Sequence, residues 1–421
     1  MIDKQPSGST LALRHSLPNG LVVLIQRNAA SPTVSVRGEI RVGAVHEHDE
    51  QSGLAIFTAA SLIRGAGQRT FQEIVSTTES IGASVNAGAG MNASGFAGRS
   101  LNEDLPLILD ILADMLIRPS FPERELERLR SQILMGLRES EQEPRTQASR
   151  AVREMLFPPG HPYRRLSSGT LKTVEALTRS DLLAFHQLYH PASVRIAIVG
   201  DVEPVEVIAL LERSFGTWTS PHQPPEFHLP EPLALHVIKR EDIQMAGKSQ
   251  SDVVWAVHGL KRNADDFYAA SMANMLLGRL GMGGRLGENV RERQGLAYHV
   301  GSGFEADWGA GPWAALAGVN PENVERTITA ILHEIEVFMR EGPSPEELSD
   351  ARDFMAGSTV LGLETNDGIA STLLAIERYD LGLDYIARYP GIIRAVTAEE
   401  IIAAAQRYLS TDAYVLAVAG P

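Results

Sequence analysis

An internal repeat limits the folds open to this chain more strongly than any other feature of its sequence. The segment LTRSDLLAFHQLYHPASVRIAIVG, from Leu177, resembles VTAEEIIAAAQRYLSTDAYVLAVAG, from Val396. Likewise FPEREL, from Phe121, resembles PSPEEL, from Pro343, and both pairs keep their place in the order of expected elements. The period of roughly 220 residues is too long for a solenoid and therefore predicts two similar domains.

Each repeat opens with a segment typical of a strand, TVSVRG in the first and SDVVWAVHG in the second. LPNGLVVLI predicts a hairpin, because Asn19 and Gly20 form a favoured two-residue turn before a buried strand. ASVNAGAGMNASGFAGRS predicts two further strands, and segments such as LPLILDILADMLI have the apolar spacing of helices. We therefore expect an α+β fold with two homologous domains. Each domain is expected to contain a mostly antiparallel or mixed sheet with helices packed on one side.

A proline-rich stretch, TSPHQPPEFHLPE, separates the two repeats at residues 219–231. Proline clusters of this kind are typical of linkers. The sequence thus predicts an N-terminal domain at 1–218 and a C-terminal domain at 232–421, and 421 residues are enough for two domains of ordinary size.

The composition excludes several classes of function. A net charge of −14 argues against nucleic acid and anionic membrane surfaces as partners, since both require a basic surface. Without cysteine the chain has no thiolate zinc site, disulfide or cysteine nucleophile. No apolar run reaches the roughly 18 residues of a membrane span. Because MIDKQPSGST has no apolar signal region, we expect a cytoplasmic protein, with a periplasmic one left open if a leader was removed.

The stretch GLAIFTAASLIRGAG, from Gly53 to Gly67, predicts a helix that begins after a turn and ends at a glycine. Its expected inner face consists of apolar residues: Ile56, Phe57, Ala59, Ala60 and Ile63. Such a helix is either an ordinary part of the core or the place of a site whose chemical groups are missing.

In the second repeat, VRERQGLAY places Arg291 and Tyr298 seven residues apart. A guanidinium can hold a carbonyl oxygen or a developing oxyanion, and a tyrosine hydroxyl can donate to the same oxygen. Alternatively, the arginine is a solvated helix charge and the tyrosine a half-buried strand residue. The preceding glycines, Gly281, Gly283 and Gly284, form either a flexible loop that contacts substrate or a tight turn before a helix. They lack the G-K-[ST] ending of a phosphate loop.

Two histidine clusters have spacings that suggest metal binding. His46 and His48 lie in VHEHDE, where we expect a solvated turn between strand and helix. His186 and His190 lie one helical turn apart in HQLYH, but Pro191 follows at once, so we expect a packed and capped helix end. Serine hydrolase chemistry is not indicated, because the chain has no G-x-S-x-G elbow in a strand-turn-helix context.

The order of several motifs gives a resemblance that covers essentially the whole chain. The first repeat contains GLAIF, IGASVNA, FPERELER, HPYRRLSSGT and FHQLYHPASVRIAIVGDV, and the second contains GMGGRLGENVRERQGLAY. In this order the chain resembles the pitrilysin-like (insulinase-like) zinc metallopeptidases. The resemblance is to the branch of two-domain subunits that includes mitochondrial processing peptidase.

The resemblance implies an H-x-x-E-H signature on the helix after Gly53, with two histidine ligands and a glutamate base. Here the histidine positions are occupied by Ile56 and Ala60, and the glutamate position by Ala59. A third ligand, expected about 76 residues further on, falls at Gly136. None of these residues can bind zinc or activate water. The chain is therefore expected to hold no cofactor and to have no peptidase activity of its own.

The resemblance also implies that Arg291 and Tyr298, with Gly283 and Gly284, bind substrate and stabilise the transition state. We therefore expect a non-peptidase subunit of a heterodimer, in which a homologous partner supplies the zinc and the two chains enclose an unfolded peptide. The alternative is a homodimeric peptide-binding or scaffold protein without a catalytic role.

Overall fold

The computed structural model describes residues 12–226, 228–279 and 283–421, which form two compact units. The described part of unit 1 comprises residues 12–134, 167–226 and 359–387. Unit 2 comprises residues 135–166, the described parts of 228–358, and 388–421. Each unit is built around its own sheet.

Unit 1 contains a six-stranded sheet, formed by its described residues in the order β1-β2-β8-β3-β7-β6. Its strands are β1 (Leu13–Ser16), β2 (Val22–Arg27), β3 (Thr33–Ile40), β6 (Ser84–Ala89), β7 (Ser94–Leu101) and β8 (Val194–Gly200). All neighbours are antiparallel except β2 and β8. The predicted hairpin is confirmed, because β1 and β2 pair across a turn in which Gly20 has a φ of 90°.

The described residues of unit 2 form a five-stranded sheet in the order β11-β12-β10-β13-β9. Its strands are β9 (Lys239–Gln244), β10 (Ser251–His258), β11 (Ala297–Ala306), β12 (Ala310–Val319) and β13 (Val415–Gly420). The only parallel pair in this sheet is β13 and β9, at the place that β8 and β2 occupy in unit 1. The repeat thus extends to strand order and direction, and the predicted α+β fold is confirmed.

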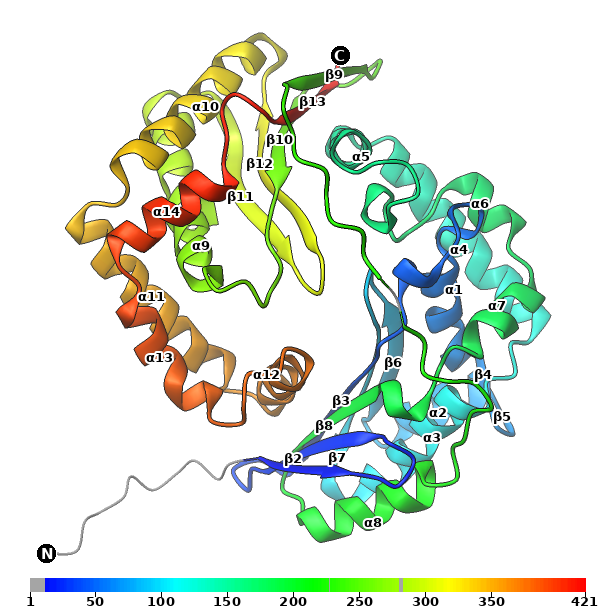
Figure 1. Ribbon diagram of the computed structural model, residues 1–421. Helices are drawn as coiled ribbons and strands as arrows, with labels where there is room; N and C mark the ends of the chain where they lie inside the picture. The colour runs from blue at the N-terminus through cyan, green and yellow to red at the C-terminus, as the bar shows by residue number, and fades with distance from the viewer. Residues whose placement is uncertain (1–11, 227, 280–282) are drawn as a thin grey trace, which may run out of the picture. The chain divides into compact units, whose positions relative to one another are not determined.

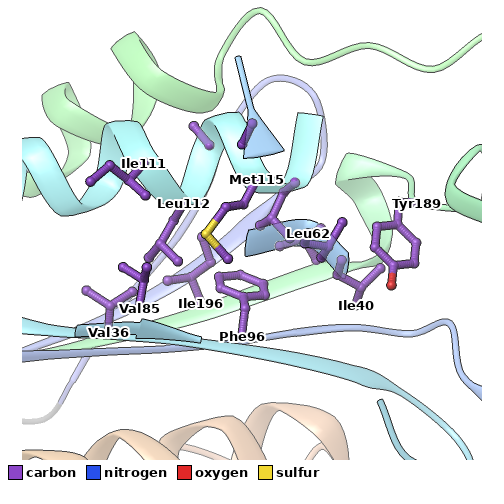
Figure 2. Close-up of a cluster of buried hydrophobic side chains, with 14 of the residues drawn as sticks. Val36, Ile40, Leu62, Val85, Phe96, Ile111, Leu112, Met115, Tyr189 and Ile196 are labelled. Carbon is purple, nitrogen blue, oxygen red and sulfur yellow. The ribbon is translucent and has the colours of Figure 1, made fainter. Parts of the chain in front are cut away.

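The main core of unit 1 lies between its sheet and three helices (Figure 1). These are α1 (Leu54–Ser61), α3 (Leu105–Ile117) and α8 (Pro204–Phe215). Figure 2 shows Leu112 and Met115 of α3 above Val36, Phe96 and Ile196 of the strands. Strand residues two apart point to the same face, so the alternating apolar residues of β3 and β8 form the floor of this core.

On the opposite face of the unit 1 sheet, the described structure has helix α12 (Asn366–Arg378), which packs on β3 and β8 (Figure 1). Leu373 and Ile376 of this helix lie in one apolar cluster with Leu24 and Val199. The strands β2 and β8 are therefore buried on both faces, which explains their continuous apolar runs.

Unit 2 repeats this arrangement. One face of its sheet is covered by α9 (Phe267–Asn274), α10 (Val324–Glu341) and α14 (Ala398–Tyr408), and the other by α5 (Pro144–Leu156) on β10 and β13. The remaining elements are β4 (Gly65–Ala66), β5 (Arg69–Thr70), α2 (Phe71–Ser80), α4 (Glu123–Glu141), α6 (Leu171–Ala176), α7 (Arg179–His186), α11 (Pro345–Gly362) and α13 (Tyr385–Ala395). None of the described helices is both long enough and apolar enough to cross a membrane.

The equivalent helices α5 and α12 are exchanged between the repeats. Helix α5 belongs to the first repeat but packs on the sheet of the second, and α12 does the reverse. The structure therefore differs from the sequence-based expectation in two respects. One is the side of each sheet that carries helices, and the other is the division of the chain into 1–218, the linker 219–231 and 232–421. Each sheet has helices on both faces instead of one, and residues 135–166 and 359–387 belong to the unit of the other repeat. An amphipathic helix packs its apolar side against another apolar surface. For α5 and for α12, the strands that provide this surface are distant from the helix in the sequence.

Candidate functional site

The start of α1 is held firmly in place. Gly53 has a φ of 97°, and a Cβ at this position would lie 2.9 Å from Val174 Cγ2 and 3.0 Å from the Ser168 carbonyl oxygen. The buried carboxylate of Glu47 accepts hydrogen bonds from the backbone N–H groups of Gly53 (3.2 Å) and Ala55 (2.6 Å). A carboxylate at a helix N-terminus satisfies donors that have no partner within the helix. The turn and the helix predicted from the sequence are thus both present.

The buried and accessible residues of α1 are distributed differently from the single inner face that the sequence predicts. Phe57 and Ala59 are fully buried, whereas Ile56, Ala60 and Ile63 are only half-buried. These three lie at positions i, i+4 and i+7, so they share one side of the helix. The prediction that all five form one inner face is therefore wrong. The residues at the two expected histidine positions lie on the more accessible side.

The positions that resemble a zinc site do not fit zinc. Ile56, Ala59 and Ala60 have no donor atom, and Gly136, at the expected third position, is an exposed residue of α4 without a side chain. Within the described ranges, no three His, Cys, Asp or Glu side chains are grouped so that they could hold a metal ion. Zinc hydrolysis requires three protein ligands and a water. This chain does not offer that set at α1.

The histidines of HQLYH have structural roles. The Nε2 of His186 lies 2.8 Å from the Leu116 carbonyl oxygen, and burial lowers the pKa of His186. His190 Nδ1 accepts the N–H of Ala192 at 3.0 Å and so caps the following turn. The predicted packed helix end is confirmed for His186, whereas His190 lies beyond α7 and caps the following turn instead of the helix.

The two histidines of VHEHDE lie in different surroundings. His46 belongs to a short 3₁₀ turn, η1 (Ala44–His46), where it is half-buried and its Nδ1 lies 3.2 Å from the Gly43 amide nitrogen. Burial lowers the pKa of His46, whereas the following His48 is exposed. The expected turn between strand and helix is present, but only the second of its two histidines, His48, is exposed to solvent.

The glycine-rich segment of unit 2 lies between two stretches of π-helix. Helix α9 continues into η7 (Met275–Arg279), and η9 (Gly287–Arg293) follows the glycines. A Cβ on Gly278 would lie 2.5 Å from the Ser302 amide nitrogen, and one on Gly284 would lie 3.2 Å from Gly278 Cα. Gly284 is buried at the start of a helix, which favours the tight-turn alternative for this residue. Gly283 is exposed, and Gly281 lies outside the described residues.

Arg291 and Tyr298 both reach solvent. Arg291 lies on η9, and its guanidinium has one ion pair within the described part of the chain, at 3.6 Å with the neighbouring Glu292. Tyr298 lies on β11 and is 69% exposed. Neither Arg291 nor Tyr298 is part of the core. The alternative that Tyr298 is a half-buried strand residue is therefore wrong. The π-helix η9 packs against β11 and places the two residues on contacting elements.

Sequence reasoning missed the polar contact that supports this region. Asn274, at the end of α9, is buried, and Ser302 Oγ of β11 donates to its Oδ1 at 2.8 Å. This hydrogen bond fixes β11 to α9 beside the closely packed glycines. The available signal was an asparagine within the apolar run MANMLLG, where a buried amide requires a partner.

Sequence profiles identify the family. The profile described as Insulinase (Peptidase family M16) matches residues 22–173, and the one described as Peptidase M16 inactive domain matches residues 176–355. Together they span most of the chain, which therefore belongs to the pitrilysin/insulinase-like family, peptidase M16.

Individual relatives agree with this assignment. The chain is 27% identical over 432 residues to an uncharacterized zinc protease of Mycobacterium leprae, covering 100% of this chain and 94% of the relative. It is 25% identical over 416 residues to the uncharacterized zinc protease YmxG of Bacillus subtilis, covering 97% of this chain and 98% of the relative.

Solved structures share the fold over nearly the whole chain. A peptidase M16 inactive domain from Pseudomonas fluorescens has a TM-score of 0.90 and 28% identity, covering 97% of this chain and 98% of the other. A protease from Helicobacter pylori has a TM-score of 0.91 at 17% identity, covering 97% and 99%, and shows the likeness of the fold alone.

Proposed function

We propose that this chain is the non-peptidase subunit of a two-chain zinc metallopeptidase. It supplies Arg291, Tyr298 and one half of a substrate chamber, and a homologous partner with H-x-x-E-H supplies the zinc and the base. The expected substrate is an unfolded peptide, and both subunits are expected in the cytoplasm. One observation carries the proposal: the substrate-holding pair is exposed, whereas α1 has no metal-binding side chain.

The absence of donors on α1 supports the first half of this proposal. Each of the four positions has lost its chemical group, so one substitution cannot restore three ligands and a base. The helix nevertheless keeps its left-handed Gly53 and its buried Glu47 anchor. The scaffold of the site is therefore maintained without its chemistry.

The second half is supported by the surroundings of Arg291 and Tyr298. The exposed Tyr298 is accessible to a substrate, and its hydroxyl can donate a hydrogen bond to a carbonyl oxygen. Among the described residues the Arg291 guanidinium is ion-paired only with the neighbouring Glu292, so it has donors available for a carbonyl oxygen. Short π-helical stretches occur frequently at functional sites, and one of them carries Arg291.

The unit 1 sheet offers a second contact for an extended peptide. Strand β6 lies at the edge of this sheet and packs beside α1. Its sequence, SVNAGA, has small side chains, which allow a peptide backbone to approach. An exposed edge can bind an extended segment by main-chain hydrogen bonds, independently of most of its sequence.

The test is a peptidase assay on an unfolded peptide. Cleavage is measured with this chain alone, with a homologue that carries H-x-x-E-H alone, and with the mixture. The mixture is repeated with Arg291→Ala, with Tyr298→Phe, and with Arg293→Ala as a control, because Arg293 lies on the same π-helix but is paired with Glu288.

We expect cleavage in the mixture only, and a loss of roughly 100-fold with Arg291→Ala, as for an oxyanion donor. The control variant should retain full activity. Cleavage by the homologue that is unchanged by this chain would refute the proposal and favour the homodimeric binding or scaffold role.

A further inference from the structure

A polar hollow lies on the face of the unit 1 sheet that carries α12. Its volume is about 610 Å³, within the range of ligand-binding pockets. Strands β3, β6 and β7 form its floor, and the N-terminal end of α12 forms one wall. It lies on the opposite face of the sheet from α1.

Strand register explains the floor of this hollow. Arg99 of β7 lies between Ser35 of β3 and Ser84 of β6 in one cross-strand row. In the next row Ala97 lies between Arg37 and Asn86. Because side chains two residues apart share a face, both rows point into the hollow, and the small Ala97 leaves space between its neighbours.

The wall of the hollow is fixed by hydrogen bonds. Arg37 donates to both carboxylate oxygens of Asp367, at 2.6 and 2.5 Å, and this guanidinium lowers the pKa of Asp367. Asn28 donates to the Asn366 side chain at 2.6 Å, and Asn366 donates to the Thr33 carbonyl oxygen at 2.8 Å. The start of α12 is thus held in place without a ligand.

Arg99 is the lining cation that remains available. It is exposed, and across the described ranges its guanidinium has neither a hydrogen bond nor an ion pair, whereas Arg37 is already paired. Glu364, at the exposed end of the wall, is the one other lining charge in the described structure without such a contact. A carboxylate in the hollow would be attracted by Arg99 and repelled by Glu364 and by Asp367, whose pKa Arg99 also helps to lower.

The hollow continues along α12. A second one, of about 450 Å³, shares Arg37 and Asn86 with the first and extends to Arg378 and Tyr379 at the end of the helix. The 13 residues of α12 rise by about 20 Å, which matches an extended peptide of roughly six residues. The two hollows, which share Arg37 and Asn86 in their linings, are together called here the α12 trough.

We propose that the α12 trough binds an extended peptide of roughly six residues and that Arg99 binds a carboxylate of this peptide. This inference rests on the proposed function, because it assumes that the chain binds peptides. The carboxylate belongs either to the C-terminus of the peptide or to an acidic side chain, and both present the same two oxygens to the guanidinium fork.

The test measures binding of fluorescent hexapeptides to this chain alone by anisotropy. The peptides end in a free acid or an amide, and carry either glutamate or glutamine near that end. The variants are Arg99→Gln, Glu364→Gln and, as a control, Arg124→Gln, an exposed arginine of α4.

We expect Arg99→Gln to weaken binding of carboxylate-bearing peptides about tenfold, Glu364→Gln to strengthen it a few-fold, and Arg124→Gln to change nothing. If the peptide amide binds more weakly than the free acid, Arg99 binds the C-terminal carboxylate. If the glutamine peptide binds more weakly than the glutamate peptide, Arg99 binds the acidic side chain. No binding by the wild-type chain, or equal binding by Arg99→Gln, would overturn the proposal. Failure of the cleavage assay with Arg99-dependent binding intact would refute only the proposed catalytic partnership.

Discussion

The helix that follows the central strand is built differently in the two units. In unit 1, α1 is a regular helix with an anchored start, and the positions expected to hold zinc ligands are occupied by apolar or small residues. In unit 2, the equivalent α9 runs into π-helix, closely packed glycines and an exposed Arg291 and Tyr298. The first region is well packed and carries no metal-binding side chain at the expected positions. The second retains irregular backbone and exposed polar groups, which packing alone does not require.

The largest effect is expected from restoring the base on α1. Ala59→Glu places a carboxylate where the side chain is fully buried, so the free energy of unfolding should fall by about 3–5 kcal/mol. Ile56→His, on the half-buried side, should cost about 1 kcal/mol. Urea unfolding of the two variants measures both changes in free energy. Equal losses would show that the two sides of α1 do not differ in burial.

A methyl group tests the packing of the glycine-rich region. Gly278→Ala brings a Cβ to 2.5 Å from a backbone nitrogen, so the free energy of unfolding should fall by about 2 kcal/mol. The control is Gly136→Ala in α4, where a Cβ meets nothing within 4 Å and should stabilise the helix by about 0.5–1 kcal/mol. If both variants change the melting temperature in the same direction, the region around Gly278 is not closely packed.

The anchor of α1 can be weakened without changing its size. Glu47→Gln replaces the carboxylate that accepts two backbone N–H groups, and we expect a loss of about 2 kcal/mol in unfolding free energy. The exposed Glu139→Gln on α4 provides a control that should change stability by less than about 0.5 kcal/mol. Hydrogen exchange of the first amides of α1 shows whether the loss is local.

Acid should destabilise unit 2 through His258. Burial, in part against Phe157 at 5.3 Å between ring centroids, lowers the pKa of His258 to about 4. The unfolded chain binds this proton near pH 6.5 and the folded chain only near pH 4, so stability falls as the pH is lowered between these values. Solvent screening around this half-buried residue reduces the expected loss to roughly 1–2 kcal/mol.

Tryptophan fluorescence can follow this change, because Trp255 and Trp313 are buried in the unit 2 core. In His258→Gln the loss between neutral and acidic pH should be smaller than in the wild-type chain. An unchanged pH dependence in this variant would assign the acid sensitivity to other groups, including the half-buried His46 and His186 of unit 1.

Local patterns were sufficient to predict much of the fold. Asn19 and Gly20 specified the first hairpin, and the alternation in TVSVRGEI specified a strand whose register the structure shows. The repeat of FPEREL and PSPEEL foretold equivalent helices, α4 and α11. These features depend on neighbours in the sequence, so periodicity and turn chemistry are enough to reveal them.

The exchange of α5 and α12 could not be predicted in this way. Periodicity shows that a helix has an apolar side, but it does not show which distant sheet that side covers. The sides of α1 were misassigned because nearly every residue from Leu54 to Ser61 is apolar or small, which leaves the pattern without direction. Arg99 was not recognised for a similar reason, since its position between Ser35 and Ser84 depends on strand pairing.

One titration tests the difference between the two regions most directly. A fixed amount of an H-x-x-E-H homologue is mixed with increasing amounts of this chain, and cleavage of an unfolded peptide is followed with the wild-type chain and with Arg291→Ala. We predict that activity rises until the two chains are equimolar, and that Arg291→Ala saturates at the same ratio with roughly 100-fold lower activity. Activity that is independent of this chain, or equal with Arg291→Ala, would contradict the role assigned to unit 2.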